Sequence, residues 1–225
     1  MTVPVVMRQS VGQPVVHDAQ SKPWRSGIVK RPVMSPLRLG FTNLEGDGQA
    51  DLKHHGGPDK AVLAYPLDHY GKWREILDLP VGGFGENWTL TGQDEEGVCL
   101  GDIYDIGTAR VQVSQPRRPC WKLARLWNRP ELAKQAQDTG RLGWYFRVLK
   151  TGDVRVRDKL IRIERPLPDW SIARMNQLMY HDRHDMEAAA FLAECLLLSA
   201  SWRESFQQRL NHHPPPDPKL RLVGE

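Results

Sequence analysis

Residues 109–123, ARVQVSQPRRPCWKL, join an alternating strand pattern to a basic, proline-rich loop that carries one cysteine. The first five residues alternate apolar and polar side chains, which is typical of a half-buried β-strand. In the loop, Pro116 and Pro119 restrict the backbone, because proline fixes φ and lowers the entropy lost on folding. The pattern predicts a strand that ends in a stiff loop holding Cys120.

Cys120 lies between Arg117 and Arg118 on one side and Lys122 on the other. A nearby cation favours the thiolate, which is the form that attacks an electrophile or binds a soft metal. Free cysteine is also a common small core residue, so the loop by itself equally allows a buried, unreactive thiol. A reactive thiolate predicts an accessible, electropositive environment for the sulfur, whereas a core thiol predicts a buried, apolar one.

Composition indicates a globular protein of 225 residues with a net charge of only +4, from 31 basic and 27 acidic residues. That charge is too small for the basic stripe of a dedicated nucleic-acid binder, so we expect no specific nucleic-acid partner. Three cysteines, Cys99, Cys120 and Cys195, are widely spaced without a CxxC pair, which argues against disulfides and structural zinc. No apolar run approaches the ~18 residues of a membrane span. We therefore expect a cytoplasmic protein that does not bind membranes.

Short strand-like runs separated by turn residues dominate the chain from about residue 27 to 165. Such spacing is typical of a β-barrel or sandwich. Two helices are predicted within it, at 66–77 and 130–138, and Gly140 is placed to end the second.

The character of the sequence changes after Pro168, where three helices are predicted at 171–180, 185–198 and 201–211. Asp185 is the expected N-cap of the second, Ser201 and Glu204 fit a capping box for the third, and the prolines at 214–216 are expected to end it. The predicted organisation is a mainly β body over residues 1–168 with its core at 24–168. A small three-helix domain and tail follow over 169–225, giving an α+β protein overall.

Two further segments carry unusual chemistry, HHGGPDK at 54–60 and FGEN at 84–87. Glycines allow a ligand to approach the backbone, and the lysine supplies positive charge. Each segment alone is also an ordinary turn. The chain lacks the GxxxxGK[ST], GxGxxG, GxSxG and HExxH motifs, which excludes the common nucleotide-binding, hydrolase and metalloprotease signatures.

In combination, five segments resemble the MOSC domain family (molybdenum cofactor sulfurase C-terminal domain), most closely its stand-alone YiiM type. They are SGIVKRPV (26–33), LEGDGQADLKHHGGPDKAVLAYP (44–66), FGEN (84–87), SQPRRPCWKL (114–123) and GWYFRVL (143–149). The resemblance covers nearly all of residues 24–168, and the helices that follow resemble the three-α domain appended in that family. Two departures are Trp88, where Leu or Ile is common, and His54, where Val is frequent.

The resemblance implies a β-barrel-like body that binds a pterin-based molybdenum cofactor, with Cys120 as the protein ligand of the metal. A thiolate is a soft ligand, which suits this role. His55 is implied as a second catalytic residue that orients an oxo group or donates a proton. The basic residues among the implied cofactor contacts would bind phosphate, and the acidic and amide residues would bind the pterin or the metal shell. These contacts are Lys60, Phe84, Gly85, Glu86, Asn87, Gln115, Arg117, Arg118 and Lys122.

The family's association with N-hydroxylated compounds implies a reductase acting on substrates such as hydroxylaminopurine-type base analogues. Because the chain shows no flavin, haem or iron–sulfur signature, its electrons are expected from a separate redox protein. Two alternatives stay open: a sulfur carrier or transferase that uses a Cys120 persulfide, and a carrier that only holds the cofactor. A homodimer is among the assemblies we consider.

Overall fold

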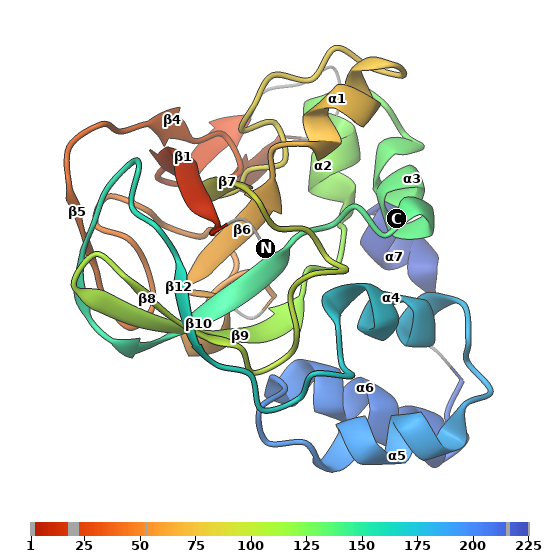
Figure 1. Cartoon of the computed structure of the whole chain (residues 1–225). Coiled ribbons are helices and arrows are strands. Elements are labelled where there is room, and N and C mark those ends of the chain that lie inside the picture. Colours follow the sequence, from red (N-terminus) through yellow and green to blue (C-terminus); the bar gives the residue numbers. More distant parts are fainter. Residues whose placement is uncertain (1–2, 18–22, 53, 215–216, 225) are drawn as a thin grey trace.

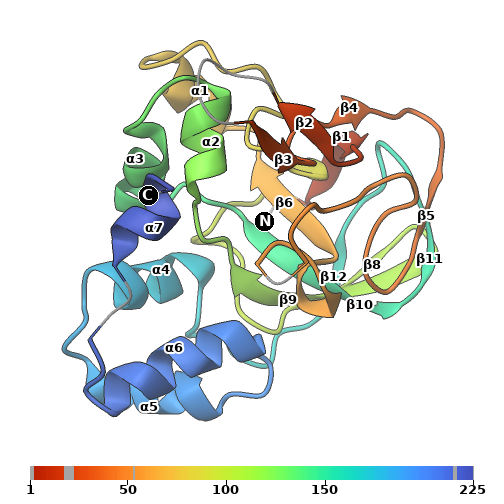
Figure 2. The ribbon, with the colours of Figure 1, turned by 180° about the vertical axis from the view of Figure 1, so that it is seen from behind.

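The computed structural model describes residues 3–17, 23–52, 54–214 and 217–224. Its body is a curled, eight-stranded mixed sheet, and helices gather along one side of that body and beyond its end (Figures 1 and 2). In spatial order, the sheet contains β12 (Ile161–Glu164), β8 (Ile103–Ile106), β9 (Ala109–Pro116), β10 (Trp144–Lys150), β6 (Val62–Pro66), β7 (Trp88–Thr91), β1 (Val5–Val11) and β4 (Arg31–Pro32). Two small antiparallel pairs accompany it, β2 (Val15–His17) with β3 (Trp24–Ser26), and β5 (Leu37–Leu39) with β11 (Gly152–Val154).

The helices form two groups. Those beside the body are η1 (Pro58–Lys60), α1 (His69–Arg74), α2 (Trp121–Leu126) and α3 (Leu132–Thr139). Those of the C-terminal part are α4 (Ile172–Tyr180), α5 (Met186–Glu194), α6 (Ala200–Leu210) and α7 (Pro218–Leu222). No helix in the described ranges is long and apolar enough to cross a membrane.

The sheet curls because the segment before β12 returns to β1. The Val6 amide donates to the Asp158 carbonyl at 3.0 Å, and the Arg157 amide donates to the Val6 carbonyl at 2.8 Å. These bonds join the two sides of the body, as closure of a barrel requires. The expected α+β fold with a barrel-like body is confirmed.

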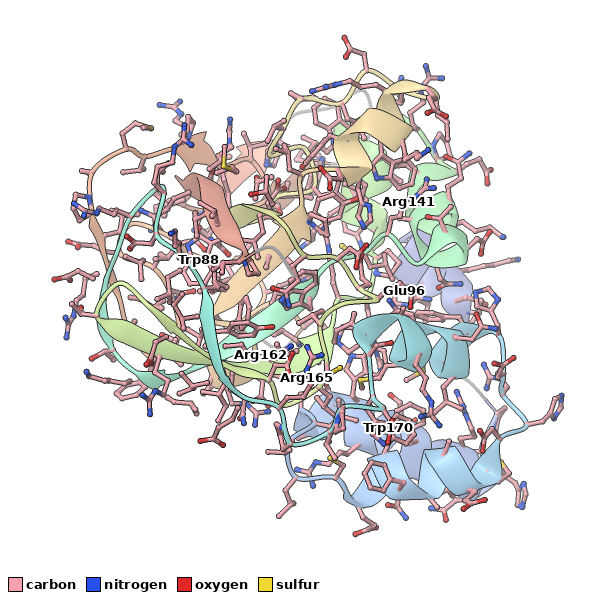
Figure 3. All side chains as sticks on the ribbon, viewed as in Figure 1. Trp88, Glu96, Arg141, Arg162, Arg165 and Trp170 are labelled. Atoms are coloured by element: carbon pink, nitrogen blue, oxygen red, sulfur yellow. The ribbon has the colours of Figure 1, made fainter. Side chains whose placement is uncertain are left out.

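Strand β10 shows how the sequence pattern fills the core. Trp144 and Phe146 point inward and are fully buried, whereas Tyr145 between them faces the opposite side of the strand. Trp88 lies in the same core (Figure 3), which continues without a break to Trp202 of α6. The body and the helices after residue 169 therefore share one hydrophobic cluster.

The helix ends confirm part of the expected capping. Asp185 accepts a hydrogen bond from the Ala188 amide at 2.9 Å as the N-cap of α5, and Gly140 ends α3 with a φ of 69°. The capping box predicted at Ser201 and Glu204 is wrong, because the N-cap of α6 is Ser199 and both residues lie inside the helix.

Three other expectations need correction. The helix predicted over 66–77 spans only 69–74, because Pro66 belongs to strand β6. The helix predicted from Pro130 starts at Leu132, with Glu131 as its N-cap. The helix predicted over 185–198 ends at Glu194, with Cys195 as the C-cap of α5. In addition, the sequence pattern predicts neither α2, which begins directly after Cys120, nor α7. Of the three prolines expected to end α6, Pro215 and Pro216 lie outside the described residues.

Candidate cofactor and active site

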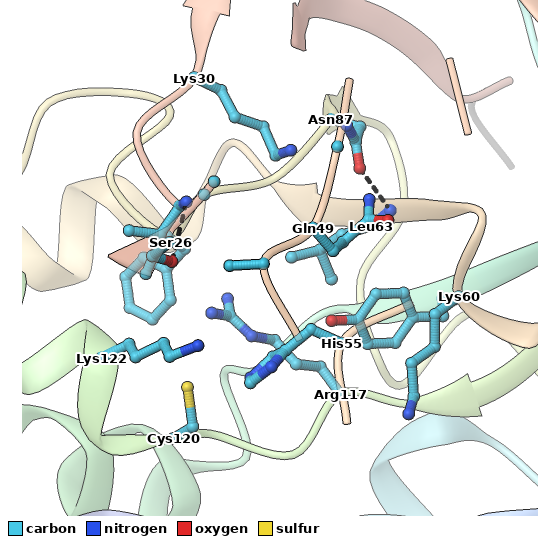
Figure 4. A pocket seen from close by; sticks show the side chains of 17 residues that line it. Ser26, Lys30, Gln49, His55, Lys60, Leu63, Asn87, Arg117, Cys120 and Lys122 are labelled. Carbon is cyan, nitrogen blue, oxygen red and sulfur yellow. Dashed lines mark hydrogen bonds between the residues drawn. The ribbon is translucent and has the colours of Figure 1, made fainter. Parts of the chain in front are cut away.

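A pocket opens where the loop after β9 meets the glycine-rich segments of the body (Figure 4). It contains about 580 Å³ of empty space, with the solvent at its mouth included. We call it the cysteine pocket. Its lining consists of Ser26, Gly27, Ile28, Lys30, Gly48, Gln49, Ala50, His55, Lys60, Leu63, Phe84, Gly85, Asn87, Arg117, Cys120, Lys122 and Tyr145.

The described lining is cationic. It contains Lys30, Lys60, Arg117 and Lys122 but no aspartate or glutamate. In Figure 4 the thiol of Cys120 points into the same space as the head groups of Lys122 and Arg117. Among the described residues, Arg117, Lys60 and Lys122 form no ion pair with a carboxylate. The pocket therefore presents positive charge to an incoming ligand.

Local backbone structure holds Cys120 at the rim of this space. The residue is the N-cap of α2, with an extended backbone (φ −134°, ψ 161°) and no side-chain capping bond. Its carbonyl instead accepts from the Leu123 amide at 3.1 Å. The thiol is thus left unused by the helix and is available to a ligand.

One wall of the pocket is fixed by a polar network around Asn87. Its side-chain oxygen accepts from the Leu63 amide at 3.0 Å, a bond drawn in Figure 4, and its amide group donates to Asp47 at 2.9 Å. Asp47 also forms an ion pair with Lys30, whose pKa is lowered by burial although Asp47 opposes the shift. These contacts make Asn87 chiefly a support for the wall and for Lys30.

His55 is held neutral by its surroundings. Burial, followed by the positive charge of Lys122, lowers its pKa from 6.5 to about 4, and Asp51 only partly opposes this. The ring Nδ1 lies 3.6 Å from an Asp51 carboxylate oxygen, beyond hydrogen-bond distance. A neutral imidazole offers one donor and one acceptor rather than a stored positive charge.

Arg117 and Arg118 are adjacent in sequence but serve different parts of the molecule. Arg117 is buried in the pocket lining, and its Nη1 has no hydrogen-bond partner among the described residues. The Arg118 side chain lies outside the pocket lining and donates to the Ser205 hydroxyl at 2.8 Å. Its guanidinium stacks on the Trp202 ring, with the central carbon 4.8 Å from the ring centroid. The predicted cofactor role thus fits the geometry of Arg117 but not that of Arg118.

Glu86 and Gln115 also lie outside the lining. A Glu86 oxygen accepts from the Tyr70 hydroxyl at 2.7 Å and the Thr89 hydroxyl at 2.8 Å, inside the protein. The Gln115 amide is buried and donates to the Pro116 carbonyl at 3.2 Å. Each side chain still keeps one buried oxygen without a partner among the described residues, Glu86 Oε2 and Gln115 Oε1, so the predicted contacts to a pterin stay predictions.

Several lining residues were missed by sequence reasoning. Lys30 and Tyr145 both stand within segments that carry the family resemblance, but neither has a local pattern that marks it as a pocket residue. Tyr145 was detectable in principle, because its neighbours at 144 and 146 alternate into the core and leave it on the opposite face. Burial raises the pKa of its hydroxyl, so Tyr145 keeps its proton.

The donor set of the pocket restricts how a metal would bind. No group of three or more His, Cys, Asp or Glu side chains is placed to hold a metal ion within the described ranges. Cys120 is the single cysteine of the lining. A metal bound here would take one protein thiolate and bring its other ligands with it.

A second cavity of about 680 Å³ lies between the body, α3 and α4. We call it the polar hollow, and Glu96 and Arg141 on its lining are labelled in Figure 3. The full lining is His69, Asp94, Glu95, Glu96, Gln137, Asp138, Thr139, Gly140, Arg141, Ala173, Asn176, Gln177 and His181.

Comparison with known proteins agrees with this architecture. Residues 51–161 match the family described as MOSC domain, and residues 170–213 match the YiiM-like, 3-alpha helix domain. The protein YflK of Bacillus subtilis (strain 168) is 43% identical over 206 residues, which cover 91% of this chain and 93% of YflK.

Two other matches extend the comparison. A protein named reductase from Gibberella moniliformis (strain M3125 / FGSC 7600) is 38% identical over 181 residues, covering 77% of this chain but 31% of that protein. The crystal structure of YiiM from Geobacillus stearothermophilus superposes with a TM-score of 0.78 at 42% identity, covering 92% of this chain and 99% of that one. The chain therefore belongs to the MOSC domain family and carries the YiiM-like three-helix domain.

Proposed function

We propose that this protein is a molybdenum-cofactor oxidoreductase that reduces N-hydroxylated compounds, such as hydroxylaminopurine-type base analogues, with electrons from a separate redox protein. The observation that carries the proposal is the cysteine pocket, in which one thiol faces a cationic lining without a described carboxylate. Membership of the MOSC family supports the cofactor. The relative named reductase supports the reaction class.

The residues of the pocket fit a phosphorylated, metal-bearing pterin. Cys120 would ligate the metal, because a thiolate is a soft donor. The unpartnered Nη1 of Arg117 requires an acceptor, and a phosphate oxygen would satisfy it. Lys60 and Lys122 would add charge to the same anion. Gly85, with a φ of 75°, lets the backbone turn close to the ligand where another residue would be strained.

The reaction needs protons as well as electrons. Reduction of R–NH–OH to R–NH₂ and water consumes two electrons and two protons. The cofactor, held by Cys120, would supply the two-electron redox chemistry, and the electrons would come from the separate redox protein. Within the pocket, the Tyr145 hydroxyl holds a proton, and the neutral His55 ring can orient the departing oxygen by a hydrogen bond.

The pKa of His55 should depend on the charge of the bound ligand. In the protein alone, burial and, after it, the neighbouring cations keep its pKa near 4. A bound anion would offset Lys122 and Arg117 and raise that pKa, since an opposite charge favours the protonated ring. The ring would then take up a proton more readily in the loaded protein than in the protein alone.

Elemental analysis of protein from a host that makes the molybdenum cofactor tests the proposal directly. We expect near-stoichiometric molybdenum in the wild type, loss of the metal in Cys120→Ser, and retention in Cys195→Ser, which changes a cysteine outside the pocket. The metal-loaded wild type should reduce an N-hydroxylated purine in the presence of a chemical reductant.

Three outcomes would contradict parts of this proposal. Folded wild-type protein without molybdenum would contradict the cofactor, and a persulfide on Cys120 would then favour sulfur transfer. Molybdenum retained by Cys120→Ser would contradict the assigned ligand. Loaded protein that reduces no N-hydroxylated substrate would favour a cofactor carrier.

A further inference from the structure

The C-terminal segment 217–224 returns from the helical part to the loop that carries Cys120. We call this segment the C-terminal strap. It contains α7, which lies beside α3 and α2 in Figures 1 and 2. The strap falls outside both segments that match a family, 51–161 and 170–213.

Arg221 connects the strap to the residue before the cysteine. Its Nη1 donates to the Pro119 carbonyl at 2.8 Å, and its Nη2 donates to the Gln137 side chain. The guanidinium also lies over the Tyr180 ring, with its central carbon 5.6 Å from the ring centroid. Gln137 of α3 and Tyr180 of α4 therefore fix the Arg221 side chain, and Arg221 in turn binds the loop.

Both peptide groups that flank Cys120 are consequently fixed. Arg221 orients the carbonyl of Pro119, and the Leu123 amide orients the carbonyl of Cys120 at 3.1 Å. Rotation about φ and ψ of Cys120 would break one of these bonds. The direction in which its thiol points depends on both, since the Cα–Cβ bond follows the backbone.

The rest of the strap anchors the same region. Leu222 is buried in a small cluster with Ala124 of α2 and Ala133 of α3. Gly224 lies against the Trp121 ring so closely that an added Cβ would come within 2.8 Å of it, and its φ is 84°. The strap thus packs on the helix that begins at Cys120.

We propose that the C-terminal strap positions the catalytic loop and that Arg221 is its positioning residue, acting on Cys120 through the Pro119 carbonyl. The inference depends on the proposed function only for the role it gives Cys120. A hydrogen bond from a charged donor is stronger than a neutral one, so its loss should free the loop locally without unfolding the protein.

The first test is amide hydrogen exchange of residues 117–124 in the full chain. We expect roughly tenfold faster exchange in Arg221→Ala, the factor that loss of such a bond implies. Arg221→Lys, which keeps a donor, should lie between this variant and the wild type. The matched control is Arg209→Ala, because Arg209 likewise donates two hydrogen bonds to other elements, here to the carbonyls of Leu178 and Met179, but none to the loop.

The second test is molybdenum content after purification from a cofactor-producing host. We expect Arg221→Ala to retain several-fold less metal than Arg209→Ala at equal thermal stability. Wild-type exchange in both arginine variants would overturn the inference, and so would equal metal content. If wild-type protein itself binds no molybdenum, the proposed function fails, whereas the exchange experiment still decides the role of the strap.

Discussion

The cysteine pocket and the polar hollow both open to solvent, but their charges are arranged in opposite ways. In the pocket, Lys60, Arg117 and Lys122 have no carboxylate partner among the described residues, and only Lys30 is paired, with Asp47. The lining of the hollow is rich in acidic residues, of which Glu95 is paired with His69 at 2.6 Å and Asp138 with Lys134. The sign of the lining charge therefore distinguishes the two cavities, because an anion is attracted to the pocket and repelled by the hollow.

Glu95 shows how the hollow uses its charge for the fold. One carboxylate oxygen meets His69, and the other accepts from the amides of Leu142 and Gly143 at 3.0 and 2.7 Å. The Gly143 carbonyl in turn accepts from the Arg117 amide. The hollow thus supports the turn on which a pocket residue rests.

The largest effect is expected for Glu95→Ala, which leaves His69 and two buried amides without their partner. We expect the free energy of unfolding to fall by about 3 kcal/mol, as when one member of a buried pair is removed. Urea denaturation measures this, and Glu95→Gln should lose less because it keeps an acceptor. A loss below about 1 kcal/mol in Glu95→Ala would show that the hollow has no structural role of this kind.

Arg117→Ala should have the next largest effect, on binding rather than on folding. We expect the apoprotein to bind inorganic phosphate at least about tenfold more weakly, because a charge-assisted contact is removed. Isothermal titration calorimetry measures the affinity. Arg110→Ala, which removes an exposed arginine of β9 paired with Asp105, is the control and should bind as the wild type does. Equal phosphate affinities of Arg117→Ala and Arg110→Ala would contradict the view that the cysteine pocket, unlike the polar hollow, binds anions.

Some strands and helix ends can be predicted from the sequence, whereas part of the pocket cannot. The alternation of residues 109–113 and 144–148 predicts the central strands, and Asp185 and Gly140 mark true helix ends, because such signals are local. Lys30 joins the pocket from a distant segment, so no local pattern identifies it. Its position depends on the tertiary network around Asp47.

Arg117 and Arg118 show the same limit within one loop. The basic run predicts positive charge near Cys120, but it does not say which side chain faces the ligand. The two side chains lie in different places, because only Arg117 belongs to the lining of the pocket. The stacking of Arg118 on Trp202 decides the choice, and that contact lies 84 residues away in sequence (202 − 118).

His55 should produce a smaller, pH-dependent effect. Its pKa is about 4 in the folded protein and 6.5 without the surrounding structure, so the folded state binds fewer protons between these values. Its contribution to stability is therefore complete above pH 6.5 and decreases as the pH falls toward 4. We expect wild-type stability to drop by about 1 kcal/mol more than that of His55→Gln between pH 7 and pH 5, after allowance for partial exposure of the ring.

Denaturation midpoints at the two pH values measure this difference. Phosphate should reduce it, because a bound anion offsets the cations that lower the pKa of His55. An equal pH dependence in wild type and His55→Gln, with or without phosphate, would contradict the assigned neutral state.

The smallest effect is expected for Asp138→Asn on the lining of the polar hollow. Asp138 and Lys134 are about half exposed and lie four residues apart on α3, so solvent screens their attraction. We expect neither the denaturation midpoint nor the phosphate affinity to change measurably, in the same assays as above. If removing this negative charge strengthened phosphate binding, the charge of the hollow would act across the molecule on the pocket. The two cavities would then form one electrostatic unit, and their separation into a structural and a ligand-binding site would be wrong.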